Sequence, residues 1–131
     1  MGRRWRDGRG ELRLRGRRPE DENPVTVPLE IATSYRARTK GLLGRDRVEG
    51  AILLSPASGV HTFRMRIPID VAYLDRRLDV IAVRTMKPGR LGLPRLRSRH
   101  VLEAAAGAMA DWGLKPGVRV RIETPPRQLP R

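Results

Sequence analysis

The apolar residues of this chain fall into short runs, and the length of these runs most constrains the fold. The clearest run is Ile69 to Leu74, and Ala51 to Leu54 and Val80 to Val83 are similar. Short apolar runs bounded by Pro, Gly or charged residues are typical of β-strands, whereas helices need longer periodic segments. No run approaches the roughly 20 apolar residues of a membrane helix. The sequence therefore predicts a strand-rich chain without a membrane span.

Several segments are predicted to be extended. The predicted strands cover residues 25–31, 51–54, 69–74, 80–83 and 118–123, residues 62–65 look extended, and residues 101–104 fit either a strand or the start of a helix. Asp75, Arg76 and Arg77 predict a turn that joins the third and fourth strands as a hairpin. Pro28 favours an edge position for the first strand, because Pro lacks the N–H that an inner strand donates.

Two short helices complete the predicted fold. Thr33 or Ser34 can cap a helix that runs to about Leu43 and ends at Gly44. A second helix is predicted over residues 108–112. The expected fold is α+β: a small, strongly curved, mainly antiparallel sheet, resembling half a barrel, with two short helices.

The length of 131 residues fits one domain. We expect a flexible basic N-terminal arm over residues 1–24, a single compact α+β domain over 25–123 and a Pro-rich C-terminal tail over 124–131. Within the arm, the alternation of Glu and Arg with Leu at residues 11–15 leaves room for one strand. The chain has no Cys, which excludes disulfides, thiolate metal sites and Cys nucleophiles.

The chain is strongly basic, with 28 Lys and Arg residues, 14 Asp and Glu residues and a formal net charge of +14. Arg suits phosphate and carboxylate partners, but the coding bias of a G+C-rich genome also favours Arg over Lys. Five cations crowd the loop predicted at residues 87–99, namely Lys87, Arg90, Arg95, Arg97 and Arg99. Such a loop either grips phosphates or is a solvated connection. Arg36, Arg38 and Lys40 of the first helix are expected to face water.

Several separated motifs occur together along the chain. They are Gly-Leu-Leu-Gly-Arg at 41–45, the run from His61 to Asp75 that contains Ile-Pro-Ile-Asp, Met-Lys-Pro at 86–88, Val-Leu-Glu-Ala at 101–104, Ala-Gly at 106–107 and Gly-Leu-Lys-Pro-Gly at 113–117. In this order and spacing they resemble the prokaryotic family called domain of unknown function 192. The resemblance covers about residues 27–123.

The resemblance implies a compact strand-rich domain with two short helices and no established activity. Many members of the family look secreted or lipid-anchored, and this sequence shows no such leader, so the expected location is cytoplasmic. Arg64 stands where many relatives carry Trp, so any pocket is expected to be more polar and cationic. Arg77 stands where relatives often have a turn Gly.

The main candidate site lies in the segment from His61 to Asp70. Side chains alternate between the two faces of an extended chain, which would align Arg64, Arg66 and Asp70 along one ridge while His61 and Phe63 pack inward. Two guanidinium groups beside one carboxylate leave donors that could receive an anion. The alternative is an ordinary ion pair that orients the turn before a strand.

Three further residues are secondary candidates. Arg45 follows a helix C-terminus, where a cation either stabilises the helix dipole or contributes to an anion site. Glu103 lies inside an apolar run and should need a cationic partner such as Arg66 or Arg45. His61 has a side chain of the type used for proton transfer, although a packed His is the alternative. The two His residues make a poor case for a metal site.

The leading hypothesis is a small non-enzymatic binding module with a cationic pocket for an anionic small molecule or protein partner. Its expected ligand-binding residues are Arg64, Arg66, Asp70, Arg45 and Glu103. One alternative is nonspecific nucleic-acid binding through the basic arm and the 87–99 loop. Another is an enzyme of unnamed reaction with His61 as base. No phosphate loop, dinucleotide fingerprint or nucleophile elbow is present in the sequence, and no cofactor is expected.

Overall fold

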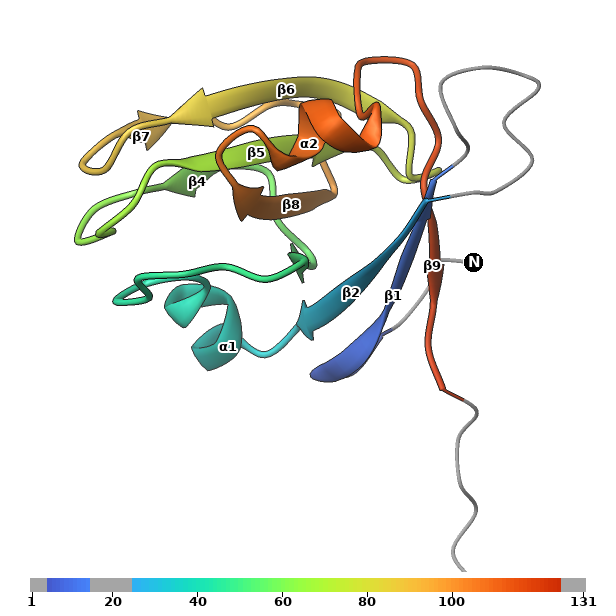
Figure 1. The fold of residues 1–131 in the computed structure, drawn as a ribbon, viewed down its shortest axis with the longest axis horizontal. Coiled ribbons are helices and arrows are strands. Elements are labelled where there is room, and N and C mark those ends of the chain that lie inside the picture. The colour runs from blue at the N-terminus through green and yellow to red at the C-terminus, as the bar shows by residue number, and fades with distance from the viewer. Residues whose placement is uncertain (1–4, 15–24, 126–131) are drawn as a thin grey trace, which may run out of the picture.

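The computed structural model describes residues 5–14 and 25–125, which form two sheets and two short helices (Figure 1). The larger sheet contains β1 (Gly8–Leu14), β2 (Val25–Ala32), β3 (Ala51–Leu54), β5 (Ile69–Leu74), β6 (Val80–Met86), β8 (His100–Ala105) and β9 (Arg121–Glu123). The smaller sheet pairs β4 (Val60–His61) with β7 (Leu91–Gly92), and the helices are α1 (Tyr35–Lys40) and α2 (Ala108–Trp112). The predicted α+β class is confirmed.

The seven strands are ordered β6-β5-β8-β3-β2-β1-β9. Every neighbouring pair is antiparallel except β2 and β3, so the sheet is mixed and it is not closed. Residues 117–120, just before β9, hydrogen-bond back to residues 78–80 at the start of β6. The strong curvature expected of half a barrel stays a prediction.

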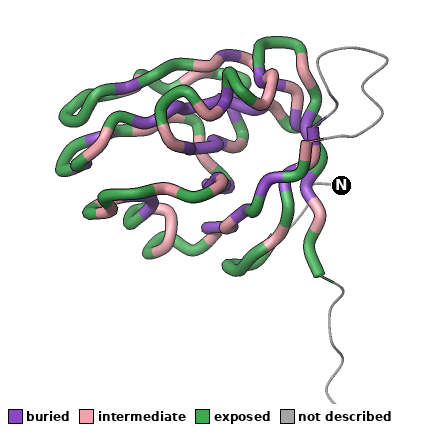
Figure 2. The backbone as a smooth tube through the Cα atoms, viewed as in Figure 1, coloured by how far each residue is buried: buried purple, intermediate pink, exposed green. Residues whose placement is uncertain are grey.

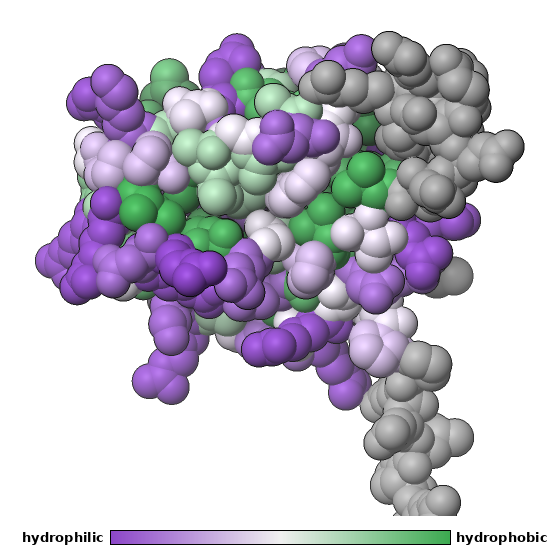
Figure 3. Space-filling view, in the orientation of Figure 1, coloured by the Kyte–Doolittle hydropathy of each residue, from purple (hydrophilic) through white to green (hydrophobic). Residues whose placement is uncertain are grey.

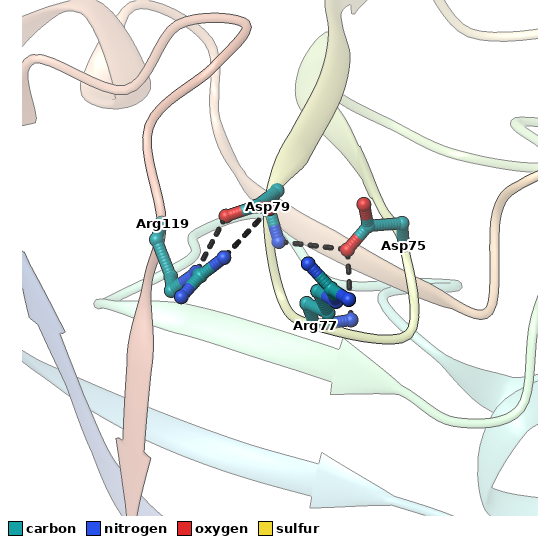
Figure 4. Close-up of polar contacts among 4 residues, drawn as sticks. All are labelled: Asp75, Arg77, Asp79 and Arg119. Carbon is teal, nitrogen blue, oxygen red and sulfur yellow. Dashed lines mark hydrogen bonds and ion pairs between the residues drawn. The ribbon is translucent and has the colours of Figure 1, made fainter.

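The turn between β5 and β6 is held by the side chains of two Asp residues (Figure 4). Asp75 accepts hydrogen bonds from the backbone N–H groups of Arg77 (2.8 Å) and Asp79 (3.0 Å). Arg119 donates two hydrogen bonds to the carboxylate of Asp79, at 2.7 and 3.1 Å. The left-handed residue of this turn is Leu78, with φ of 69°. The turn predicted at residues 75–77 therefore extends to Asp79 and docks onto the segment before β9.

β1 overlaps the part of the predicted arm in which the alternation of Glu and Arg with Leu allows one strand. It pairs with β2 over residues 8–14 and with β9 over residues 11–13. The rest of that arm, residues 1–4 and 15–24, and residues 126–131 of the predicted tail lie outside the described residues. Because β1 covers the free side of β2, the edge position predicted from Pro28 is wrong. Pro28 is tolerated there because the ladder with β3 begins only at Leu29.

Three adjacent strands of the larger sheet, β5, β8 and β3, are buried on both faces. All four residues of β3 and all six of β5 are buried, as are four of the six in β8. One apolar cluster includes Leu53, Leu74 and Leu102 together with Met109 of α2. The other includes Ile52, Tyr73 and Val101 with Leu42 after α1. Buried parallel or central strands need apolar residues at consecutive positions, which is why these runs are continuous rather than alternating.

The elements that flank this core are shorter than the sequence predicts or differ from it. Ser34 caps α1 by accepting from the N–H of Ala37 (3.1 Å), but the helix ends at Lys40 rather than near Leu43. Residues 62–65 form turns instead of an extended segment. The 87–99 loop contains β7 and is not structureless. Neither described helix is long and apolar enough to cross a membrane.

The entry into β3 provides a test of this arrangement. Gly50 has φ of 68°, and an added Cβ would overlap the backbone oxygen of Pro28. Gly44 has φ of 75° and open space around it. We expect Gly44→Ala to lower the free energy of unfolding by about 1–2 kcal/mol through backbone strain alone. Gly50→Ala should cost about 1–3 kcal/mol more, because β2 must shift. Urea unfolding of both variants measures the difference, and equal losses would contradict the close approach.

Candidate anion-binding pocket

The structure does not bring the predicted ridge of Arg64, Arg66 and Asp70 together. Arg64 is exposed and has φ of 64°, a left-handed conformation that breaks the expected alternation. Arg66 is exposed and donates to Asp46 at 3.2 Å. Asp70 is only 3% exposed. The two Arg residues therefore lie in a surface turn, while the carboxylate lies within the core.

Asp70 holds three elements together. One carboxylate oxygen accepts from the backbone N–H groups of Gly107 (2.9 Å) and Met109 (3.1 Å), at the start of α2. The other accepts from the Thr85 hydroxyl of β6 at 2.7 Å. A carboxylate at a helix N-terminus satisfies N–H groups that have no partner within the helix. The role of Asp70 is therefore structural, and the prediction that it orients two Arg side chains is wrong.

Arg45 is part of an ion pair that joins the turn after α1 to β2. Its guanidinium donates to both carboxylate oxygens of Glu30, at 3.0 and 2.8 Å. This bidentate contact lowers the pKa of Glu30 and raises the pKa of Arg45. Arg45 therefore acts through this ion pair with Glu30 rather than through the dipole of the helix. Because both partners are engaged, Arg45 is a poor candidate for contact with a ligand.

Glu103 lies in β8, opposite Ile52 of β3 and Val71 of β5, and it is 3% exposed. The predicted partners Arg45 and Arg66 pair elsewhere, and no described residue gives Glu103 a hydrogen bond or an ion pair. Gly41 packs beside it, since an added Cβ there would lie 3.1 Å from its Oε1. Burial raises the pKa of Glu103 to about 7. The prediction that it needs a cationic partner is therefore wrong.

The two His residues have different surroundings. His61 is exposed, contrary to the inward packing that its parity predicts, and its ring stacks on Phe63 with 5.1 Å between centroids. No acidic residue contacts His61 within the part of the chain that the structure describes. The Nδ1 of His100 lies 2.7 Å from the hydroxyl of Ser55, which is 7% exposed. This pair was not predictable from the sequence, because 45 residues separate its members.

A pocket of about 520 Å³ is lined by residues that flank Ser55 and His100 in the sequence and by residues of α1. Its walls come from α1, the segment after β3 and the segment before β8. Its lining residues are Tyr35, Arg38, Thr39, Leu54, Pro56, Ala57, Ser58, Gly59, Ser98 and Arg99. Two of these residues are cations and none is acidic. The lining of this pocket is therefore basic, and none of the ligand-binding residues predicted from the sequence belongs to it.

Hydrogen bonds between the walls fix the shape of this pocket. Arg38 Nη1 donates to the carbonyl of Pro56 at 3.0 Å, which ties α1 to the opposite wall. The N–H of Ala57 donates to the carbonyl of Arg99 at 2.8 Å, and the Ser98 hydroxyl donates to the carbonyl of Ala57 at 3.1 Å. These contacts use backbone acceptors. They leave most of the cationic donor capacity of the two Arg side chains available.

Three donor groups of the pocket lack a partner among the described residues. The Nε of Arg38 is buried without a hydrogen-bond partner. The guanidinium of Arg99 and the hydroxyl of Ser58 belong to exposed residues and make no hydrogen bond with another described side chain or carbonyl. Of the three groups, only the buried Nε of Arg38 carries the free-energy cost of a donor without an acceptor. Such a donor set, without a competing carboxylate, is complementary to a compact anion.

Arg38 was not predicted as a site residue, because the sequence pattern places it on the water-facing side of the helix. A signal was present, since Tyr35, Arg38 and Thr39 are spaced as i, i+3 and i+4 and therefore share one face of α1. Arg99 was noted only as one of five loop cations. Nothing in the local sequence pointed to Ser58 as its neighbour.

The structural role of Asp70 can be tested by its removal. Asp70→Ala leaves two helix N–H groups and one buried hydroxyl without their acceptor, and we expect a loss of about 3 kcal/mol in the free energy of unfolding. Asp46→Ala is the control, because it removes an exposed ion pair worth less than about 1 kcal/mol. Denaturant unfolding measures both. Similar small losses would show that Asp70 does not hold α2.

Glu103 should make stability depend on pH. Its folded pKa of about 7 lies above the ordinary value of 4.5, so the folded state binds the proton more tightly. The contribution of Glu103 to the free energy of unfolding is therefore fully present below about pH 4.5. It is lost as the pH rises through 7, by about 3 kcal/mol in all. Glu103→Gln stays neutral at every pH. Its free energy of unfolding should therefore rise relative to that of the wild type by that amount between about pH 4 and pH 8. A difference in unfolding free energy that is constant with pH would contradict the buried, unpaired carboxyl.

Comparison with known proteins identifies the family. The profile of DUF192, described as "Uncharacterized ACR", matches residues 17–122. UPF0127 protein PH1112 of Pyrococcus horikoshii is 31% identical over 84 residues, which cover 60% of this chain and 73% of that protein. UPF0127 protein PF1050 of Pyrococcus furiosus is 24% identical over 101 residues, which cover 73% of this chain and 87% of that protein.

Two solved structures share the fold. A protein of unknown function from Novosphingobium aromaticivorans has a TM-score of 0.71 at 21% identity, covering 85% of this chain and 83% of that one. A Sinorhizobium meliloti protein described as a "putative transcription regulator" has a TM-score of 0.73 at 17% identity, covering 92% and 98%. Likeness at these identities concerns the fold alone. The resemblance seen in the motifs is confirmed by the profile match, and the chain belongs to the DUF192 family.

Proposed function

We propose that this protein is a non-enzymatic binding module whose pocket, between α1 and the segment 55–59, takes a small anionic ligand. The observation that carries the proposal is the set of donors in the pocket. Arg38 and Arg99 supply positive charge, Ser58 supplies a hydroxyl, and no lining residue is acidic. Phosphate and carboxylate groups match such donors in charge and geometry.

The remaining lining residues limit the size and character of the ligand. Tyr35, Leu54, Pro56 and Ala57 offer apolar contact beside the cations. Small-molecule sites combine an apolar wall with a few placed polar groups in this way. The volume of about 520 Å³ is that of a pocket for a small molecule. The favoured ligand is therefore a small molecule with one anionic group and a short apolar part.

The two alternative functions have weaker support. Nucleic-acid binding would use the exposed cations Lys87, Arg90 and Arg97, and the description of the Sinorhizobium meliloti protein is in line with it. However, three exposed Leu side chains lie among these cations and suit nucleic acid poorly. An enzyme with His61 as base lacks an acidic or nucleophilic group beside that ring in the described residues.

The proposal is tested by titrating the full chain with inorganic phosphate and with citrate, followed by amide chemical shifts. We expect shifts concentrated at residues 57–59 and 98–99. Arg38→Gln and Arg99→Gln should each weaken binding by about tenfold or more, since each removes a charged donor. The matched control is Arg64→Gln, which removes one exposed positive charge outside the pocket and should leave the affinity unchanged.

Because Arg38 also contacts the carbonyl of Pro56, its variant must be checked for an intact amide spectrum, and Arg99→Gln provides the second, independent variant. Equal weakening by Arg64→Gln would mean that net charge, rather than the pocket, attracts the anion. Absence of binding by both phosphate and citrate, or shifts scattered over the whole surface, would also contradict the proposal.

A further inference from the structure

The smaller sheet and its loops form a tightly bonded projection at one end of the molecule, which we call the β4–β7 platform (residues 60–66 and 87–97). Thr62 is its centre. The Thr62 hydroxyl donates to the carbonyl of Lys87 (2.7 Å) and accepts from the N–H of Arg90 (2.8 Å), and its carbonyl accepts from Gly89 (2.8 Å). Thr62 itself has no exposed surface. The two loops are therefore held in one arrangement.

This platform carries most of the exposed large hydrophobic side chains of the described residues. Leu96 is 100% exposed, Leu93 74%, Leu91 64% and Phe63 47%. The tips of both loops at this end are mostly exposed in Figure 2. A single exposed apolar side chain is ordinary, whereas several of them close together are typical of interaction surfaces.

The charges of the platform have one sign. It contains six cations and no Asp or Glu, the cations being Arg64, Arg66, Lys87, Arg90, Arg95 and Arg97. Arg95 lies with its guanidinium 4.7 Å from the centre of the Tyr73 ring, and Arg66 contacts Asp46. The other four are exposed. In the space-filling view, strongly hydrophilic residues lie next to hydrophobic ones along the same end of the molecule (Figure 3).

We propose that the β4–β7 platform docks the protein onto an anionic lipid bilayer, with Leu91, Leu93 and Leu96 entering the interface and the surrounding cations contacting lipid headgroups. Peripheral binding of this kind combines a few inserted apolar side chains with several cations near the surface. A nucleic acid would use the cations but would leave the Leu side chains in water. Leu91 lies in β7, Leu93 and Leu96 lie in the loop that follows it, and none of the three lines the described pocket. Exposed apolar side chains of this kind suit insertion into lipid better than capture of a peptide.

This inference is independent of the proposed pocket, because neither Arg38 nor Arg99 belongs to the platform. The test is co-sedimentation of the full chain with phosphatidylcholine vesicles, with and without phosphatidylglycerol. We expect binding only to the phosphatidylglycerol vesicles, falling as salt is added. Leu93→Ser combined with Leu96→Ser should weaken it at least about tenfold. Arg90→Gln combined with Arg97→Gln should weaken it about 30-fold.

A matched control separates the platform from the overall charge. Arg76→Gln combined with Arg77→Gln removes the same charge from the β5–β6 turn, at the other end of β5 (Figure 1), and should leave vesicle binding within about twofold. This control keeps the platform intact.

Three results would overturn the inference. The first is vesicle binding that the Leu variants leave unchanged, which would make the surface purely electrostatic and favour nucleic acid. The second is equal binding to vesicles without phosphatidylglycerol. The third is tighter binding to soluble polyglutamate than to vesicles with the same dependence on Leu93 and Leu96, which would assign the platform to an acidic protein partner.

Discussion

The burial of β3, β5 and β8 on both faces is the constraint on which the rest of the structure depends. Ladders run from β3 through β8 to β5, so that any polar side chain on these strands must find its partners inside the protein. Two acidic residues lie there, Asp70 and Glu103, both 3% exposed. Their different surroundings explain which of them stabilises the fold.

Asp70 meets this constraint by accepting hydrogen bonds from two backbone N–H groups and one hydroxyl. It thereby joins β5 to β6 and to the start of α2. Glu103 has no such partner among the described residues, and it meets the constraint by favouring its neutral form. Below about pH 7, a proton therefore neutralises Glu103 in place of the cation that the sequence suggests. The contrast shows that an acidic residue in an apolar run does not by itself indicate an ion pair.

The parts of the fold that were predictable from the sequence are those set by local patterns. Continuous apolar runs identified β3 and β5, and the Gly-bounded segment 108–112 identified α2. The inner position of β2 was not predictable. The strand that covers its free edge is β1, and β1 lies in a segment rich in Gly and Arg. The ridge of Arg64, Arg66 and Asp70 failed since the left-handed conformation of Arg64 interrupts the alternation.

The pocket was not predictable for a further reason, namely that its donors come from three separate segments. Arg38, Ser58 and Arg99 are brought together only by the hydrogen bonds that link α1, the segment after β3 and the segment before β8. No spacing in the sequence encodes that proximity. The i, i+3, i+4 face of α1 was the one local signal, and it indicates a shared face without showing what the face meets.

The Arg residues fall into two groups. Some form ion pairs within the chain, and others have no carboxylate beside them. Arg45, Arg66 and Arg119 form ion pairs with Glu30, Asp46 and Asp79. The coding bias that favours Arg explains neither these pairs nor the absence of acidic residues from the pocket lining and the platform.

Where a carboxylate accompanies Arg, the charge stabilises a turn or joins two strands. Where none does, the positive charge of the Arg side chains has no carboxylate of this chain beside it to compensate it. The pocket and the platform are two places in the described structure where such uncompensated charge lies beside apolar surface. The binding role that we propose therefore rests on the missing carboxylates more than on the number of Arg residues.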